Sequence, residues 1–128
     1  MEADLIQRLE LPFQEIPAAG VHGINLRSLP GNLFKLVRGV FSSRRILKSF
    51  QPDVILYTGG YVAAPMAVAG AQTPSVVFVP DIEPGLALKF ISRFATKIAL
   101  VTEDSKQYFK KKSKLIVTGY PVRHELTR

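Results

Sequence analysis

The chain has 128 residues, of which 47% are hydrophobic and 21% charged, and its formal net charge is +7. This length and apolar content exclude a disordered chain and predict one folded domain or part of one. The absence of cysteine excludes disulfide scaffolds, thiolate zinc sites and cysteine nucleophiles, and with only two histidines we expect no metal site. No apolar run is long enough for a membrane-spanning helix, and residues 1–10 carry charges where a signal peptide would be apolar.

The first part of the chain is predicted to hold two short elements and one long helix. Residues 2–9 have the apolar spacing of a helix, and residues 13–16 alternate as a short strand does. A longer helix is predicted from Asn32 to Phe50, and Pro30-Gly31 is expected to form the loop that leads into it.

The remaining chain alternates between apolar runs and helix-compatible stretches. Apolar residues in consecutive positions indicate strands that are covered on both faces, as in parallel sheets. Strand and helix repeated in this way predict an α/β fold, a Rossmann-like parallel sheet with flanking helices and right-handed crossovers. The predicted strands are 53–57, 76–79, 98–101 and 115–117, and the predicted helices are 62–70, 86–94 and 103–112, the last capped by Thr102.

Positive charge is concentrated in two segments of the chain. No acidic residue occurs between Glu15 and Asp53, and that interval contains Arg27, Lys35, Arg38, Arg44, Arg45 and Lys48. A second cluster, partly offset by two acidic residues, consists of Lys106, Lys110, Lys111, Lys112 and Lys114. Basic clusters attract phosphate, whether it belongs to nucleic acid, to a lipid headgroup or to a nucleotide.

The long basic helix has a wide apolar arc beside its cationic residues. Phe34 and Phe41 extend the apolar face beyond what one core contact needs. Such a helix is typical of a segment that lies on an anionic membrane, and a core helix with solvated basic residues explains the pattern equally well. The candidate membrane-surface residues are Leu33, Phe34, Lys35, Val37, Arg38, Phe41, Arg44 and Arg45.

Three loops follow predicted strands and carry residues suited to ligand binding. Gly59 and Gly60 allow the backbone to approach a ligand closely, Asp81 is a candidate general base, and Arg123 could hold a phosphate. Each of these motifs also occurs in ordinary turns. Because the carboxyl ends of parallel strands share one edge of the sheet, the three loops together predict a ligand site there.

Several short segments follow one another along the chain: the opening MEADLI with the later IPAAGVHG, the run PDVILYT followed by GGYVAAP, the run P-x-V-V-F, the segment ATKIALV and the closing TGYPVR. Together and in this order they resemble the MurG-like glycosyltransferases of family 28, which have the GT-B architecture. The resemblance extends from Met1 to about Arg123.

The resemblance implies transfer of N-acetylglucosamine from UDP-GlcNAc to a lipid-linked diphosphate sugar, the step from lipid I to lipid II in peptidoglycan synthesis. It implies a cytoplasmic enzyme, peripheral on the inner face of the cell membrane, without a cofactor. Gly59, Gly60 and Tyr61 match a family loop near the acceptor diphosphate, and Arg123, which is also a candidate acceptor-binding residue, matches the segment that leads to the second domain. The family's His-Glu-Gln-Asn motif is replaced by Phe78-Val79-Pro80-Asp81, which leaves Asp81 as a weak candidate for the catalytic base.

The resemblance also implies that residues 1–128 form a single, incomplete acceptor-side domain. The first strands, the glycine-rich loop and the donor domain would lie outside this chain, so UDP-GlcNAc would be held by a missing domain or a partner chain, and 1–128 alone would be inactive. The alternative is a noncatalytic α/β module that binds a membrane surface or nucleic acid. Nucleic acid is the less favoured partner, because the aromatic residues of the basic helix lie on its apolar arc.

Overall fold

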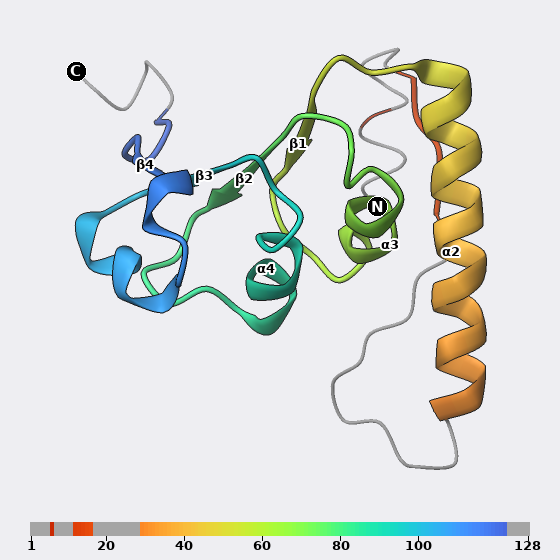
Figure 1. Cartoon of the computed structure of the whole chain (residues 1–128), viewed down its shortest axis with the longest axis horizontal. Helices are drawn as coiled ribbons and strands as arrows, with labels where there is room; N and C mark the ends of the chain where they lie inside the picture. The colour runs from red at the N-terminus through yellow and green to blue at the C-terminus, as the bar shows by residue number, and fades with distance from the viewer. Residues whose placement is uncertain (1–5, 7–11, 17–28, 123–128) are drawn as a thin grey trace.

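The computed structural model describes residues 6, 12–16 and 29–122. In this part of the chain, a layer of helices lies beside a small sheet (Figure 1). The α-helices are α2 (Leu29–Phe50), α3 (Ala63–Ala69) and α4 (Leu86–Ile91). The strands are β1 (Ile55–Tyr57), β2 (Ser75–Val79), β3 (Lys97–Leu100) and β4 (Leu115–Val117). Two 3-10 helices, η2 (Glu103–Tyr108) and η3 (Lys112–Lys114), connect β3 to β4.

The sheet is parallel and its strand order is the chain order, β1-β2-β3-β4. Strand β1 pairs with β2, β2 with β3 and β3 with β4, each in parallel register. All four predicted strands are therefore present, and the predicted α/β fold is confirmed. Helices α3 and α4 are also where the sequence predicts them, each shorter than its predicted range.

The core lies on one face of this sheet. Tyr57, Val77 and Leu100 are buried in one cluster with Ala67 of α3 and Leu88 of α4. Right-handed crossovers between strands in sequential order place the connecting helices on the same face, which explains this one-sided cover.

The opposite face of the sheet is open at both ends. Leu56 of β1 is 65% exposed and Ile116 of β4 is 47% exposed. The prediction that consecutive apolar residues mark strands covered on both faces is therefore wrong for these two strands. Residues of the central strands on that face, such as Val76 and Phe78, are half-buried.

Two predictions for the first part of the chain need correction. Pro12 to Ile16 form no strand, although the sequence alternates there. Pro30 and Gly31 belong to the first turn of α2 and do not form a loop. Proline is compatible with a first turn because the N–H groups there have no partner within the helix. Of the predicted helix at 2–9, only Ile6 is among the described residues, and it is helical.

The predicted α-helix at 103–112 is also wrong. The chain forms the 3-10 helix η2, and Thr102 stands at its N-cap position without a side-chain hydrogen bond to the helix. Phe109 ends the helix in an extended conformation and is only 7% exposed, because its ring joins the core. Burial of this ring and repulsion among the lysines that follow it oppose a longer helix.

Candidate functional site

The loop after β1 turns the chain through two glycines in the left-handed region. Gly59 has a φ of 126° and Gly60 a φ of 81°. L-residues with a Cβ rarely adopt such angles, so the paired glycines are required by the backbone of this turn. A Cβ on Gly60 would meet no atom within 4 Å, which leaves the space beside it open to a ligand.

The backbone of this turn presents hydrogen-bond donors. The carbonyls of Gly60 and Tyr61 accept the N–H groups of Ala63 and Ala64 at 3.3 and 3.2 Å, which fixes the turn into α3. Within the described part of the chain, the N–H groups of Gly59, Gly60 and Tyr61 donate to no backbone carbonyl. Unpaired N–H groups beside glycines suit an anionic ligand.

The loop after β2 carries Asp81 on the surface. Asp81 is exposed, and its backbone carbonyl accepts a hydrogen bond from the hydroxyl of Ser105 at 3.5 Å. Ser105 is fully buried, so this contact joins the loops that follow β2 and β3. The next residues are held by the buried Pro84 and by an ion pair of 3.6 Å between Glu83 and Lys89.

The loop after β4 completes the same edge. Gly119 has a φ of 75°, and the ring of Tyr120 packs edge-to-face against Phe78 with centroids 5.9 Å apart. Arg123 lies outside the described residues. The loops that carry Gly59, Gly60, Tyr61 and Asp81 thus follow neighbouring parallel strands at one edge of the sheet, as the sequence predicts.

Tyr57 is a residue of this region that the sequence analysis missed. It ends β1 immediately before the glycine turn, is 4% exposed, and its hydroxyl has no hydrogen-bond partner among the described residues. Burial raises the pKa of Tyr57 from 10.0 to about 12. The sequence shows that this tyrosine ends an apolar run, but not that its hydroxyl is buried, because that burial depends on how the helices pack over the sheet.

Helix α2 exposes aromatic and basic side chains together. Phe34 and Phe41 are 63% and 64% exposed, and Val37 is 44% exposed. The guanidinium of Arg38 lies 5.9 Å from the centroid of the Phe34 ring. Lys35, Arg44 and Arg45 are also exposed, whereas nothing is described of the side chain of Leu33.

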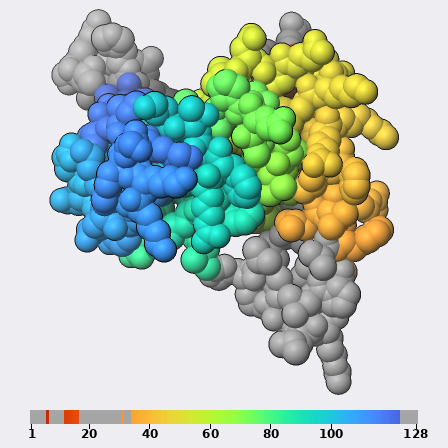
Figure 2. All heavy atoms as spheres, viewed as in Figure 1, coloured from red at the N-terminus to blue at the C-terminus, as the bar shows by residue number. Residues whose placement is uncertain are grey.

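The other side of α2 packs against α3, and its buried residues there are Gly39 and Ser43. One face of α2 therefore packs against the rest of the molecule, and the other, which carries apolar and cationic side chains, is exposed to solvent. In the space-filling view α2, coloured orange to yellow, forms the right side of the molecule (Figure 2).

The amino-terminal half of α2 points toward the same side of the molecule as the loops after β1 and β2 (Figure 1). A helix that leads into a strand beside it runs against that strand, so its first turns approach the strand's carboxyl end. With 22 residues, α2 extends well beyond the three-residue strand β1 that follows it. The first turns of α2, with the exposed Phe34, and the loops at the carboxyl edge of the sheet therefore lie toward one end of the molecule, whereas the exposed Phe50 ends the helix at the other.

The described residues contain no cluster of three or more His, Asp or Glu side chains that could hold a metal ion. Among the helices of residues 29–122, none is long and apolar enough to cross a bilayer.

The parallel sheet with its flanking helices defines a Rossmann-like α/β domain, and the glycine turn at its carboxyl edge is the candidate ligand site. The family model for the glycosyltransferase family 28 N-terminal domain matches residues 1–100. The chain belongs to glycosyltransferase family 28, and the resemblance seen in the sequence is confirmed.

Two relatives carry the name UDP-N-acetylglucosamine–N-acetylmuramyl-(pentapeptide) pyrophosphoryl-undecaprenol N-acetylglucosamine transferase. The protein of Roseiflexus sp. (strain RS-1) is 38% identical over 146 residues, which cover 98% of this chain and 33% of the relative. The protein of Desulforamulus reducens is 35% identical over 129 residues, which cover 98% of this chain and 34% of the relative. The chain thus spans only a third of the length of these relatives.

The crystal structure of MurG from Acinetobacter baumannii has the same fold. It superposes with a TM-score of 0.72 at 22% sequence identity, over 100% of this chain and 36% of that chain. This match supports the sequence-based assignment of the fold to part of a GT-B glycosyltransferase.

Proposed function

We propose that this chain is the acceptor-side domain of an N-acetylglucosaminyltransferase that transfers GlcNAc from UDP-GlcNAc to a lipid-linked diphosphate sugar, converting lipid I to lipid II. The observation that carries the proposal is the similarity to transferases of this name over 98% of the chain. The domain is incomplete in residues 1–128, and the donor site belongs to a further domain or a partner chain.

The glycine turn is the proposed site for the acceptor diphosphate. The unpaired N–H groups of Gly59, Gly60 and Tyr61 are suited to bind diphosphate oxygens, and charge-assisted hydrogen bonds of this kind are stronger than neutral ones. Arg123 is proposed to add a cationic contact to the same group.

In the proposed reaction, the acceptor hydroxyl oxygen attacks the anomeric carbon of GlcNAc from the face opposite UDP. The carbon–oxygen bond to UDP breaks with inversion, and a general base takes the hydroxyl proton. Asp81 is the proposed base, because its exposed carboxylate lies on the loop after β2, next to the glycine turn after β1.

The exposed face of α2 is the proposed contact with the inner, cytoplasmic face of the cell membrane. Phe34, Val37 and Phe41 would enter the headgroup region, while Arg38, Arg44 and Arg45 would bind anionic lipid. A lipid-linked acceptor then reaches the glycine turn from the surface on which the protein lies.

Binding of a soluble, short-chain analogue of the lipid-linked acceptor to the full chain tests the diphosphate site. Calorimetric titration is expected to show binding that Gly60→Ala weakens by about tenfold, because a Cβ forces the turn out of its φ of 81° and moves the N–H donors. Gly31→Ala is the matched control, since its Cβ meets no atom within 4 Å.

Equal binding by both variants would contradict the assignment of the glycine turn. Absence of acceptor binding in a chain that still binds anionic vesicles would instead favour the noncatalytic membrane-binding module.

A further inference from the structure

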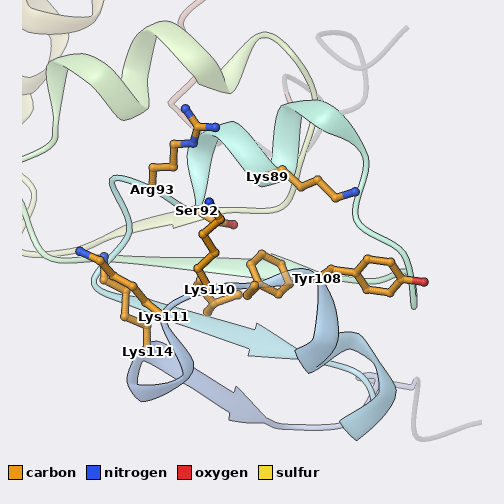
Figure 3. Close-up of a pocket in the computed structure, with 9 residues that line it drawn as sticks. Lys89, Ser92, Arg93, Tyr108, Lys110, Lys111 and Lys114 are labelled. Atoms are coloured by element: carbon orange, nitrogen blue, oxygen red, sulfur yellow. The ribbon is translucent and has the colours of Figure 1, made fainter.

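A cationic pocket lies between α4 and the 3-10 helices that follow β3 (Figure 3). Its volume is about 350 Å³, within the range of small-molecule sites. None of its nine lining residues is acidic, and five are basic: Lys89, Arg93, Lys110, Lys111 and Lys114. In Figure 3, Lys89 and Arg93 come from the α4 wall, and the other lysines come from the opposite wall.

The base of the pocket is apolar. Ile98 and Phe109 are 2% and 7% exposed and belong to the core. The hydroxyl of Ser92 donates to the carbonyl of Leu88 at 2.6 Å and is not free for a ligand. The ring of Tyr108 adds a further apolar surface. The pocket therefore combines an apolar base with a basic rim.

Two of the five cations already have partners. Lys89 pairs with Glu83 at 3.6 Å and lies 5.3 Å from the centroid of the Tyr108 ring. The amino group of Lys114 donates to the carbonyl of Ala95 at 2.5 Å.

The other three cations are Arg93, Lys110 and Lys111, and no acidic side chain within the described ranges pairs with them. All three line the pocket and are exposed to solvent, so they give its rim a positive charge that favours an anionic ligand.

The pocket is distinct from the site at the carboxyl edge of the sheet. Ser92 and Arg93 precede β3, and Lys110, Lys111 and Lys114 precede β4. Segments that lead into parallel strands lie at the amino edge of the sheet, so these four cations and Ser92 lie there, whereas Lys89 and Tyr108 reach toward the loop after β2 through the ion pair of Lys89 with Glu83.

We propose that this pocket binds a phosphate ester, with the phosphate at Arg93, Lys110 and Lys111 and the organic part over Tyr108 and Phe109. A phosphate group accepts several charge-assisted hydrogen bonds from such a cluster. The apolar base gives the ester an advantage over inorganic phosphate, because its organic part excludes water from this surface. The same chemistry is offered by a phospholipid headgroup and by a soluble phosphorylated metabolite.

Two double variants of equal charge change test the pocket. Lys110→Gln with Lys111→Gln removes two rim cations. Lys97→Gln with Lys112→Gln removes two exposed cations that do not line the pocket and do not lie on α2. The full chain and both variants are titrated with glucose 6-phosphate, and are sedimented with vesicles of phosphatidylglycerol and phosphatidylcholine in equal parts.

A soluble ligand is indicated if the pocket variant binds glucose 6-phosphate at least about tenfold more weakly than the unaltered chain, while the control variant changes by less than about twofold. A headgroup is indicated if no soluble phosphate binds and the pocket variant alone loses vesicle binding. Equal behaviour of the two variants in both assays would overturn the proposal, because any loss of binding would then depend on the net charge of the chain and not on the pocket.

Discussion

Tyr57 places a hydroxyl in the core directly before the glycine turn, without a hydrogen-bond partner among the described residues. An unpaired buried hydroxyl costs free energy that a phenylalanine in the same position would not. We expect Tyr57→Phe to raise the free energy of unfolding by about 1 kcal/mol, measured by urea denaturation at neutral pH.

The same residue gives the stability a dependence on alkaline pH. The pKa of Tyr57 is about 12 in the folded chain and 10.0 when exposed, so between these values the unfolded state binds fewer protons. Below pH 10 ionisation of Tyr57 does not change the free energy of unfolding. As pH rises from 10 to about 12 this ionisation lowers the free energy of unfolding, by up to about 1.4 kcal/mol per pH unit. Comparison with Tyr57→Phe separates this effect from the titration of lysines. Parallel plots of the free energy of unfolding against pH for the two proteins would refute the prediction.

Gly70, directly after α3, lies where β1 and α2 come close to the end of that helix. A Cβ there would lie 2.7 Å from Ile55 Cδ1 of β1, 3.1 Å from the carbonyl oxygen of Met66 and 3.3 Å from Leu47 Cδ1 of α2. Since the Met66 oxygen is backbone, side-chain rotation alone does not relieve the contact.

We expect Gly70→Ala to lower the free energy of unfolding by about 1–3 kcal/mol, measured by urea denaturation. Gly31→Ala in α2 is the control, because it meets no atom and is expected to stabilise the helix by about 0.5–1 kcal/mol. Similar effects of the two substitutions would show that packing at Gly70 is looser than described.

The proposed membrane contact of α2 and its packing against α3 lie on separate faces of the helix. Phe34 and Phe41 are exposed, so Phe34→Ser with Phe41→Ser is expected to leave the free energy of unfolding within about 0.5 kcal/mol. The same change removes the apolar surface proposed to enter the bilayer. Sedimentation with anionic vesicles is expected to fall by at least about tenfold. Retention of vesicle binding together with loss of stability would make α2 a core helix.

The elements that the sequence predicts correctly are those whose pattern is imposed by burial. Strands β1 to β4 come from apolar runs, and α2 comes from a periodicity of many turns. The strand predicted at 13–16 fails because four alternating residues do not specify a partner strand. The helix predicted from Glu103 fails because burial of Phe109 overrides local spacing.

The sequence predicts the glycine turn of the candidate site, but not the residues that surround it. Gly59 and Gly60 take the left-handed angles that their pairing after a strand indicates. The orphan hydroxyl of Tyr57 follows from tertiary packing and leaves no sequence pattern. The lysine cluster at 106–114 indicates affinity for phosphate, but only the fold brings Arg93 to it.

The sheet as a unit has a buried face and an open one. Leu56 is 65% exposed, whereas Val77, one strand away on the other face, is fully buried. Leu56→Lys is therefore expected to change the free energy of unfolding by less than about 1 kcal/mol, and Val77→Lys to unfold the chain. Circular dichroism during urea denaturation measures both. Strong destabilisation by Leu56→Lys would show that the open face is covered in solution.

Strand order also governs how the molecule assembles. Ile55 pairs with Ser75, Val76 with Lys97 and Ile98 with Leu115, so each ladder joins residues only about 20 positions apart. Short loop closures cost little entropy, and each new strand finds its neighbour already formed. The sheet can therefore grow from β1 toward β4 while the ribosome is still extending the chain, with the lysine-rich pocket the last part to take shape.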